Sequence, residues 1–100
     1  MNKRYKITQL DENEQPLLTL EQCKAVFTEQ HDFTYEDAFI VTQDGVQMKI
    51  KGDFFMWHVN DVKIPFRFFD GEVYVAVAHD VVYEKAKFMA SLLQADCIEG

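Results

Sequence analysis

The strongest constraint in this chain is an alternation of apolar and polar side chains over residues 38–78, interrupted by two-residue turn signals. The signals are Asp44-Gly45, Gly52-Asp53, Asn60-Asp61 and Asp70-Gly71. Residue pairs of this kind tolerate the positive φ angles that tight antiparallel reversals need. They predict five consecutive strands, at residues 38–43, 46–51, 54–59, 62–69 and 72–78.

Each two-residue reversal fixes the register of its strands, and therefore which side chains share a face. The four reversals consistently place one set of apolar residues on the same face of the sheet, the inner face, and we expect this set to form the core: Phe39, Val41, Val46, Met48, Ile50, Phe55, Trp57, Val59, Val62, Ile64, Phe66, Phe68, Val73, Val75 and Val77. They also agree on a basic and aromatic set on the outer face: Lys49, Lys51, Phe54, Met56, His58, Lys63, Arg67, Phe69 and Tyr74. The missing N–H of Pro65 predicts a local break in the ladder beside it.

Two helical segments can cover the inner face. Thr19 to Gln22 form a capping box that opens a helix running to about Gln30. Asp80 is the predicted cap of a second helix, which carries a broad apolar stripe and ends near Ala95. A strand over residues 4–10 precedes both helices, and its position in the sheet is left open.

These elements predict an α+β two-layer sandwich. It has a mainly antiparallel meander sheet, in the order β-α-β-β-β-β-β-α, with two helices packed on one face. With 100 residues, of which 48% are apolar, we expect a single domain over 1–100, because this length supports one core and not two.

Composition also narrows the choice of partner and compartment. A net charge of −7 favours encounters with basic proteins and opposes bulk nucleic acid. No apolar run has the length of a membrane span and no secretory pattern is present, so we expect a cytoplasmic protein with no membrane partner. The spacing of Cys23 and Cys97 predicts free thiols.

No residue pattern indicates catalysis, a metal or a cofactor. The interior glycines mark turns rather than a phosphate loop, and the only serine lies on the polar side of a helix. Cys23 with His31 as its base is a weaker interpretation than Cys23 as a helix core residue. The doublets His31-Asp32 and His79-Asp80 are better explained as loop and helix cap than as metal ligands. We therefore predict a protein that is not an enzyme and needs no cofactor.

On the outer face, cations and rings gather in an acidic protein. One explanation is an ordinary surface, on which lysine stems cover scattered apolar groups. We predict a protein-interaction module that self-associates through this face as a homodimer, since contiguous apolar area is often buried at a twofold interface.

Two alternatives stay open. A small acidic inhibitor or immunity-type protein would meet a basic enzyme such as a nuclease through carboxylates on one edge. That acidic edge comprises Asp11, Glu12, Glu14, Glu29, Asp32, Glu36 and Asp37. Single-stranded nucleic acid could stack on the outer face, although the net charge makes this the least favoured partner.

Overall fold

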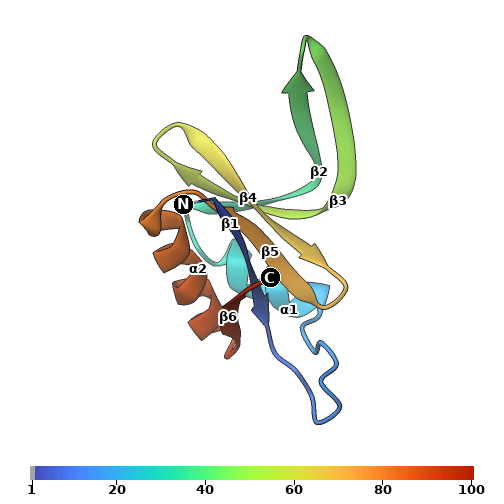
Figure 1. Ribbon diagram of the computed structural model, residues 1–100, viewed down its shortest axis with the longest axis vertical. Helices are drawn as coiled ribbons and strands as arrows, with labels where there is room; N and C mark the ends of the chain where they lie inside the picture. The colour runs from blue at the N-terminus through green and yellow to red at the C-terminus, as the bar shows by residue number, and fades with distance from the viewer. Residues whose placement is uncertain (1) are drawn as a thin grey trace.

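The computed structural model describes residues 2–100 and shows one antiparallel sheet with two helices (Figure 1). The sheet has the spatial order β2-β3-β4-β5-β1-β6. The elements in chain order are β1 (Lys3–Thr8), α1 (Leu20–Thr28), β2 (Phe33–Gln43), β3 (Val46–Val59), β4 (Val62–Phe69), β5 (Glu72–Val77), α2 (Asp80–Leu92) and β6 (Asp96–Glu99). The predicted α+β fold with a mainly antiparallel sheet is confirmed.

Three of the four predicted reversals form. In Asp44-Gly45, Asn60-Asp61 and Asp70-Gly71, both central residues have φ between 47° and 82°, as type I′ hairpins require. The registers that these turns predict are present: Val41 lies opposite Met48 across the first of them. The sorting of side chains into two faces therefore follows from the turns.

The reversal predicted at Gly52-Asp53 is wrong. β3 continues through these residues as one strand of 14 residues, and Gly52 lacks the positive φ that such a turn would need. The cause lies in β2, which begins at Phe33 instead of residue 38 and is long enough to pair with both halves of β3. Phe33 and Tyr35 supply the apolar cross-strand partners that a further hairpin would have supplied. Gly52 and Asp53 together lie opposite Asp37, a bulge of the kind that bends a strand.

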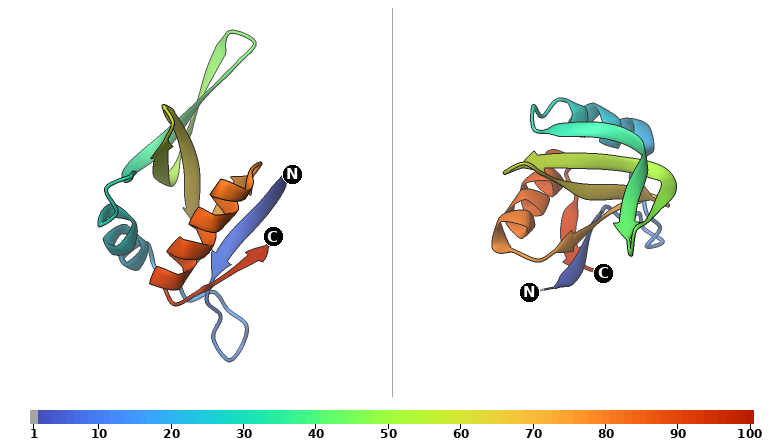
Figure 2. Two further views of the ribbon diagram at one scale, coloured as in Figure 1. Left: turned by 90° about the vertical axis from the view of Figure 1, so that its left-hand side faces the viewer. Right: turned by 90° about the horizontal axis from the view of Figure 1, so that it is seen from above.

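Beyond this bulge, β2 and β3 leave the rest of the sheet as a two-stranded ribbon, residues 38–51, which we call the arm (Figure 1). β4 pairs with β3 only from Asp53 to Val59, so each strand of the arm has only the other as its neighbour. The arm projects from one end of a molecule that measures 46 × 26 × 26 Å (Figure 2). The remainder of the chain is called the body.

The core lies between the sheet of the body and the two helices, which cover the same face. From α1, the ring of Phe27 stacks on Phe55 with 4.5 Å between centroids, and neither residue is exposed. From α2, Ala86 and Met89 are fully buried in the same cluster. Trp57, predicted for the inner face, is only 6% exposed. The packing of both helices on one face is therefore confirmed.

The predicted inner face is not buried along its whole length. Val46 and Met48 are 60% and 54% exposed, because they lie in the arm, where neither helix covers them. Val62 lies beside the β3–β4 reversal, outside the part of the sheet that the helices cover, and is 54% exposed. The prediction that these residues belong to the core is wrong, although their shared face was assigned correctly.

The ends of the second helix also differ from the prediction. α2 begins at Asp80 with His79 as its N-cap, so Asp80 lies in the first turn, where its charge complements the helix dipole. The segment after α2 forms β6, a strand that was not predicted, and its pairing with β1 places β1 between β5 and β6. The expected break beside Pro65 is present, because the β4–β5 ladder ends at Phe66.

Candidate functional site

The pairing of β1 with β5 adds two cations to the outer face of the body. Arg4 lies opposite Ala76, and Lys6 lies opposite Tyr74. Sequence reasoning missed both because it left the neighbour of this strand open. The alternation of Arg4 and Lys6 with the apolar residues between and after them was the available signal.

The predicted interaction residues occupy one side of β3, β4 and β5 but divide into separate groups. Lys49 and Lys51 lie on the arm, and His58 lies opposite Lys63 next to the β3–β4 reversal. Arg67 on β4 lies opposite Tyr74 on β5, and Phe69 lies next to the β4–β5 reversal. Phe54 and Met56 share this side but are only 3% and 2% exposed, so a partner cannot reach them without a rearrangement.

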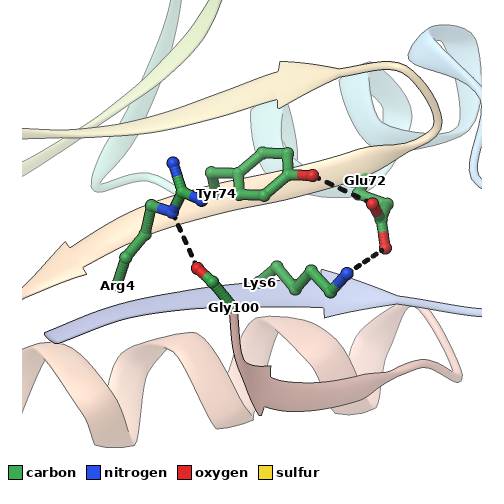
Figure 3. Close-up of polar contacts among 5 residues, drawn as sticks. All are labelled: Arg4, Lys6, Glu72, Tyr74 and Gly100. Carbon is green, nitrogen blue, oxygen red and sulfur yellow. Dashed lines mark hydrogen bonds and ion pairs between the residues drawn. The ribbon is translucent and has the colours of Figure 1, made fainter.

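Glu72 is a buried carboxylate on the outer face and is held by its neighbours. It accepts a hydrogen bond from the Tyr74 hydroxyl at 2.9 Å and pairs with the Lys6 ammonium at 3.2 Å (Figure 3). Burial raises the pKa of Glu72, but the hydrogen bonds from Tyr74 and Lys6 and the charge of Lys6 outweigh it, so the pKa lies below its ordinary value. Burial, followed by the bond to Glu72, raises the pKa of Tyr74. Glu72 is therefore ionised, and its charge is balanced within the fold by Lys6.

Arg4 lies on the other side of the Tyr74 ring (Figure 3). Its Nε donates to the backbone oxygen of Gly100 at 2.7 Å, and its Cζ lies 5.1 Å from the centroid of the ring. This arrangement holds the guanidinium beside an aromatic face, and no Asp or Glu side chain in residues 2–100 pairs with it.

Arg67 is held between two aromatic rings. Its Cζ lies 5.5 Å from the centroid of Phe54 and 5.4 Å from that of Phe69. Gly52 makes room for this stack, since a Cβ there would lie 3.1 Å from the Phe54 ring and 3.4 Å from the guanidinium. A glycine at position 52 is therefore favoured because a side chain would crowd the Phe54 ring and the Arg67 guanidinium, and not because the backbone has a positive φ.

The predicted acidic residues do not form one edge. Asp11, Glu12 and Glu14 belong to the β1–α1 loop, at the end of the molecule opposite the arm (Figure 1). Glu36 lies on the outer face in an ion pair with Lys63, at 3.1 Å. The remaining members lie at the C-cap of α1, at the start of β2 and at the bulge: Glu29, Asp32 and Asp37.

Asp32 joins α2 to the sheet. Its carboxylate accepts from the indole of Trp57 at 2.9 Å and from the ammonium of Lys85 at 2.8 Å. Burial raises the pKa of Asp32, but these bonds and the Lys85 charge lower it by more, and the net pKa is below its ordinary value. Such contacts indicate a structural role for a residue predicted to meet a partner.

The structure does not bring the remaining candidate residues for catalysis or metal binding together. Cys23 has no exposed surface, and burial raises its pKa to about 12, so its thiol is both protonated and shielded. No set of three or more metal-ligating side chains is clustered within the described residues. Neither of the helices in residues 2–100 has the length and hydropathy that crossing a membrane requires.

Two of the surface hollows bring several outer-face side chains together. The larger, about 720 Å³, lies in the angle between arm and body, where Ile40 and Lys49 approach Met56 and Lys63. The smaller, about 480 Å³, is lined by four side chains of the body: Arg4, Arg67, Phe69 and Tyr74. Comparison with known proteins found no match to this chain among protein-family models, curated proteins or solved structures.

Proposed function

We propose that this protein is a non-enzymatic interaction module that self-associates through the apolar face of the arm. The observation that supports the proposal is the composition of that face. Its three cross-strand pairs are Phe39 with Ile50, Val41 with Met48, and Gln43 with Val46. None of these side chains is charged, and Val46 and Met48 are more than half exposed.

An uncovered face of this kind is unusual for an isolated domain. In the body the equivalent face is covered by α1 and α2, whereas in the arm neither helix covers it and, within residues 2–100, only Phe39, at the base, packs on a ring of the body, that of Phe54. A two-stranded ribbon is only marginally stable in water without a further layer. A contiguous exposed apolar surface is typical of an interaction site. A second protein surface would supply the missing layer.

Charge favours a second copy on the arm over a second copy on the outer face. Two arm faces can meet without removing any charge from water, which would be costly. The outer face carries four cations that have no Asp or Glu partner in residues 2–100: Arg4, Lys49, Lys51 and Arg67. A twofold axis through that face would bring like charges together. The arm therefore replaces the outer face as the proposed interface.

The size of the arm sets the strength of the association. A strand of six residues is about 20 Å long, and a two-stranded ribbon is about 10 Å wide. Two such faces bury only several hundred Å², which is less than the roughly 1,200 Å² of a typical stable interface. We therefore expect a weak dimer, with a Kd on the order of micromolar or higher, that dissociates on dilution.

Sedimentation velocity over a wide range of protein concentration tests this proposal. The wild-type protein should shift from monomer to dimer, and Met48→Glu should stay monomeric because it places a charge in the interface. Gln47→Glu is the matched control, since it adds the same charge to the adjacent exposed residue on the opposite side of the ribbon. It should associate like the wild type.

Three results would contradict the proposal. The first is a wild-type protein that remains monomeric at high micromolar concentration. The second is an equal loss of association in Met48→Glu and Gln47→Glu, which would indicate a general effect of charge. The third is a dimer that survives Met48→Glu but not Phe69→Asp, which would assign the interface to the outer face.

A further inference from the structure

We infer that the smaller hollow of the outer face, lined by Arg4, Arg67, Phe69 and Tyr74, binds a small planar molecule that carries an oxyanion. The oxyanion is a carboxylate or a phosphate, and the two guanidinium groups recognise it. This site lies on the body, and its occupancy does not depend on association through the arm.

The sheet register brings the lining residues together from three strands. Arg67 on β4 and Tyr74 on β5 are direct cross-strand neighbours. On the other side of Tyr74, β1 places Lys6 opposite the ring, with Arg4 two residues earlier on the same face. The tyrosine ring is thus flanked by one guanidinium from each neighbouring strand.

Both guanidinium groups lie against aromatic rings, and the Nε of Arg4 also donates to the backbone oxygen of Gly100, but neither group has an acidic side chain of residues 2–100 as a partner. Glu72, the acid of this part of the face, already forms an ion pair with Lys6 and accepts a hydrogen bond from Tyr74. Two adjacent cations without a counter-charge on a sheet surface attract an anion.

The donors of Arg67 are also incompletely satisfied. Its Nε is buried and has no hydrogen-bond partner, which is uncommon for a strong donor. A guanidinium has five N–H donors in a planar fork that matches the two oxygens of a carboxylate or phosphate. The Nε has no surface open to a ligand, so an oxyanion in the hollow would bind the N–H groups on the side of the guanidinium that lines it.

The site is preorganised by its aromatic residues. The stack between Phe54 and Phe69 restricts the Arg67 head group, so little conformational entropy is lost on binding. Phe69 is itself 56% exposed and offers an apolar ring at the rim, on which a planar group can stack. The volume of about 480 Å³ lies within the range of small-molecule sites.

The experiment is an NMR titration of the full chain with three probes. Adenosine monophosphate carries a phosphate, 4-hydroxybenzoate carries a carboxylate, and adenosine carries neither. At least one anionic probe should bind with a Kd below about 1 mM, with the largest shifts at the amides around Arg67 and Tyr74. Adenosine should bind about tenfold more weakly or not at all. The preferred anionic probe identifies which oxyanion the site takes.

Variants separate specific recognition from general attraction. Arg67→Gln should weaken the anionic probe about tenfold or more, and Arg67→Lys should also weaken it because the fork is lost. Lys51→Gln is the matched control, since it removes one positive charge from the same face but on the arm, and it should bind like the wild type. Thermal melts report whether each variant is folded, and the shift map of the wild type locates the site independently of any variant.

Several outcomes would overturn the inference. One is the absence of shifts around Tyr74 with either anionic probe at about 5 mM. Another is equal binding of adenosine and adenosine monophosphate, which would show that the oxyanion is not recognised. A third is an equal loss of affinity in Lys51→Gln and Arg67→Gln, which would reduce the effect to net charge.

Discussion

The arm and the β4–β5 hairpin are built alike, on type I′ reversals with apolar side chains alternating along each strand. In the β4–β5 hairpin, the inner residues Phe66, Val73 and Val75 are at most 2% exposed, whereas Val46 and Met48 of the arm are at least 54% exposed. The two ribbons differ in what lies over them, because the helices reach one and not the other. Alternation decides which side chains share a face, and only a covering layer makes that face stabilising.

Truncating one side chain on each side of the bulge should give the largest difference in stability between a variant of the body and a variant of the arm. Phe55→Ala removes a fully buried ring that stacks on Phe27, so the free energy of unfolding should fall by about 3–5 kcal/mol. Met48→Ala in the exposed arm should change it by less than about 0.5 kcal/mol. Urea denaturation at a protein concentration too low for association measures both. Similar losses in the two variants would show that the arm is covered within the monomer.

The outer face of the body differs from the apolar face of the arm in that it contains a buried carboxylate, Glu72, which is held by hydrogen bonds. The pKa of Glu72 lies below its ordinary value of 4.5. The carboxylate therefore stabilises the fold above pH 4.5, and this contribution is lost as the pH falls through the lower pKa of the folded state. Glu72→Gln should lower the free energy of unfolding by about 1–2 kcal/mol at pH 7, and the difference from wild type should shrink in acid.

Denaturation of wild type and variant at pH 7 and near pH 3 measures this effect. Glu12→Gln serves as the control, because Glu12 is an exposed residue of the β1–α1 loop; it should leave the stability unchanged at both pH values. A Glu72→Gln variant as stable as the wild type at neutral pH would mean that the contacts of Glu72 with Lys6 and Tyr74 do not stabilise the fold.

Part of the architecture was predictable because it depends on residues close together in the chain. The reversal at Asp44-Gly45 sets Val41 against Met48 without reference to any other element. Gly52-Asp53 was misread because the same residue types suit a turn and a bulge. The choice between them depends on distant partners, since Phe33 and Tyr35 pair with the second half of β3.

The candidate site could be predicted only in part for the same reason. Arg67, Phe69 and Tyr74 come from one hairpin, and its turn alone places them on a common face. Arg4 joins them through the pairing of β1 with β5, a long-range contact that leaves little trace in local sequence. The burial of Phe54 was missed because Phe39, from the base of the arm, lies 5.7 Å away between ring centroids, and this contact exists only once the arm bends.

The bend between arm and body is held by a hydrogen bond whose loss should destabilise the fold less than the loss of Phe55 or Glu72, and this bond tests how arm and body are joined. The Tyr35 hydroxyl on β2 donates to the carboxylate of Asp53, in the bulge of β3. This hydrogen bond, together with burial, raises the pKa of Tyr35 to about 12. The bond therefore stabilises the fold below pH 10, the ordinary pKa of tyrosine, and its contribution is lost as the pH rises toward 12.

Tyr35→Phe should lower the free energy of unfolding by about 1 kcal/mol near neutral pH, and the difference from wild type should vanish at strongly alkaline pH. If the bond fixes the base of the arm, amide hydrogen exchange should accelerate at Met48 and Ile50 but not at Phe66 in the body. Tyr5→Phe is the control, because the Tyr5 ring packs on Tyr83 in the body. Unchanged protection of the arm amides in Tyr35→Phe would mean that backbone pairing across the bulge is enough to hold the arm, and that the hydroxyl adds stability without adding orientation.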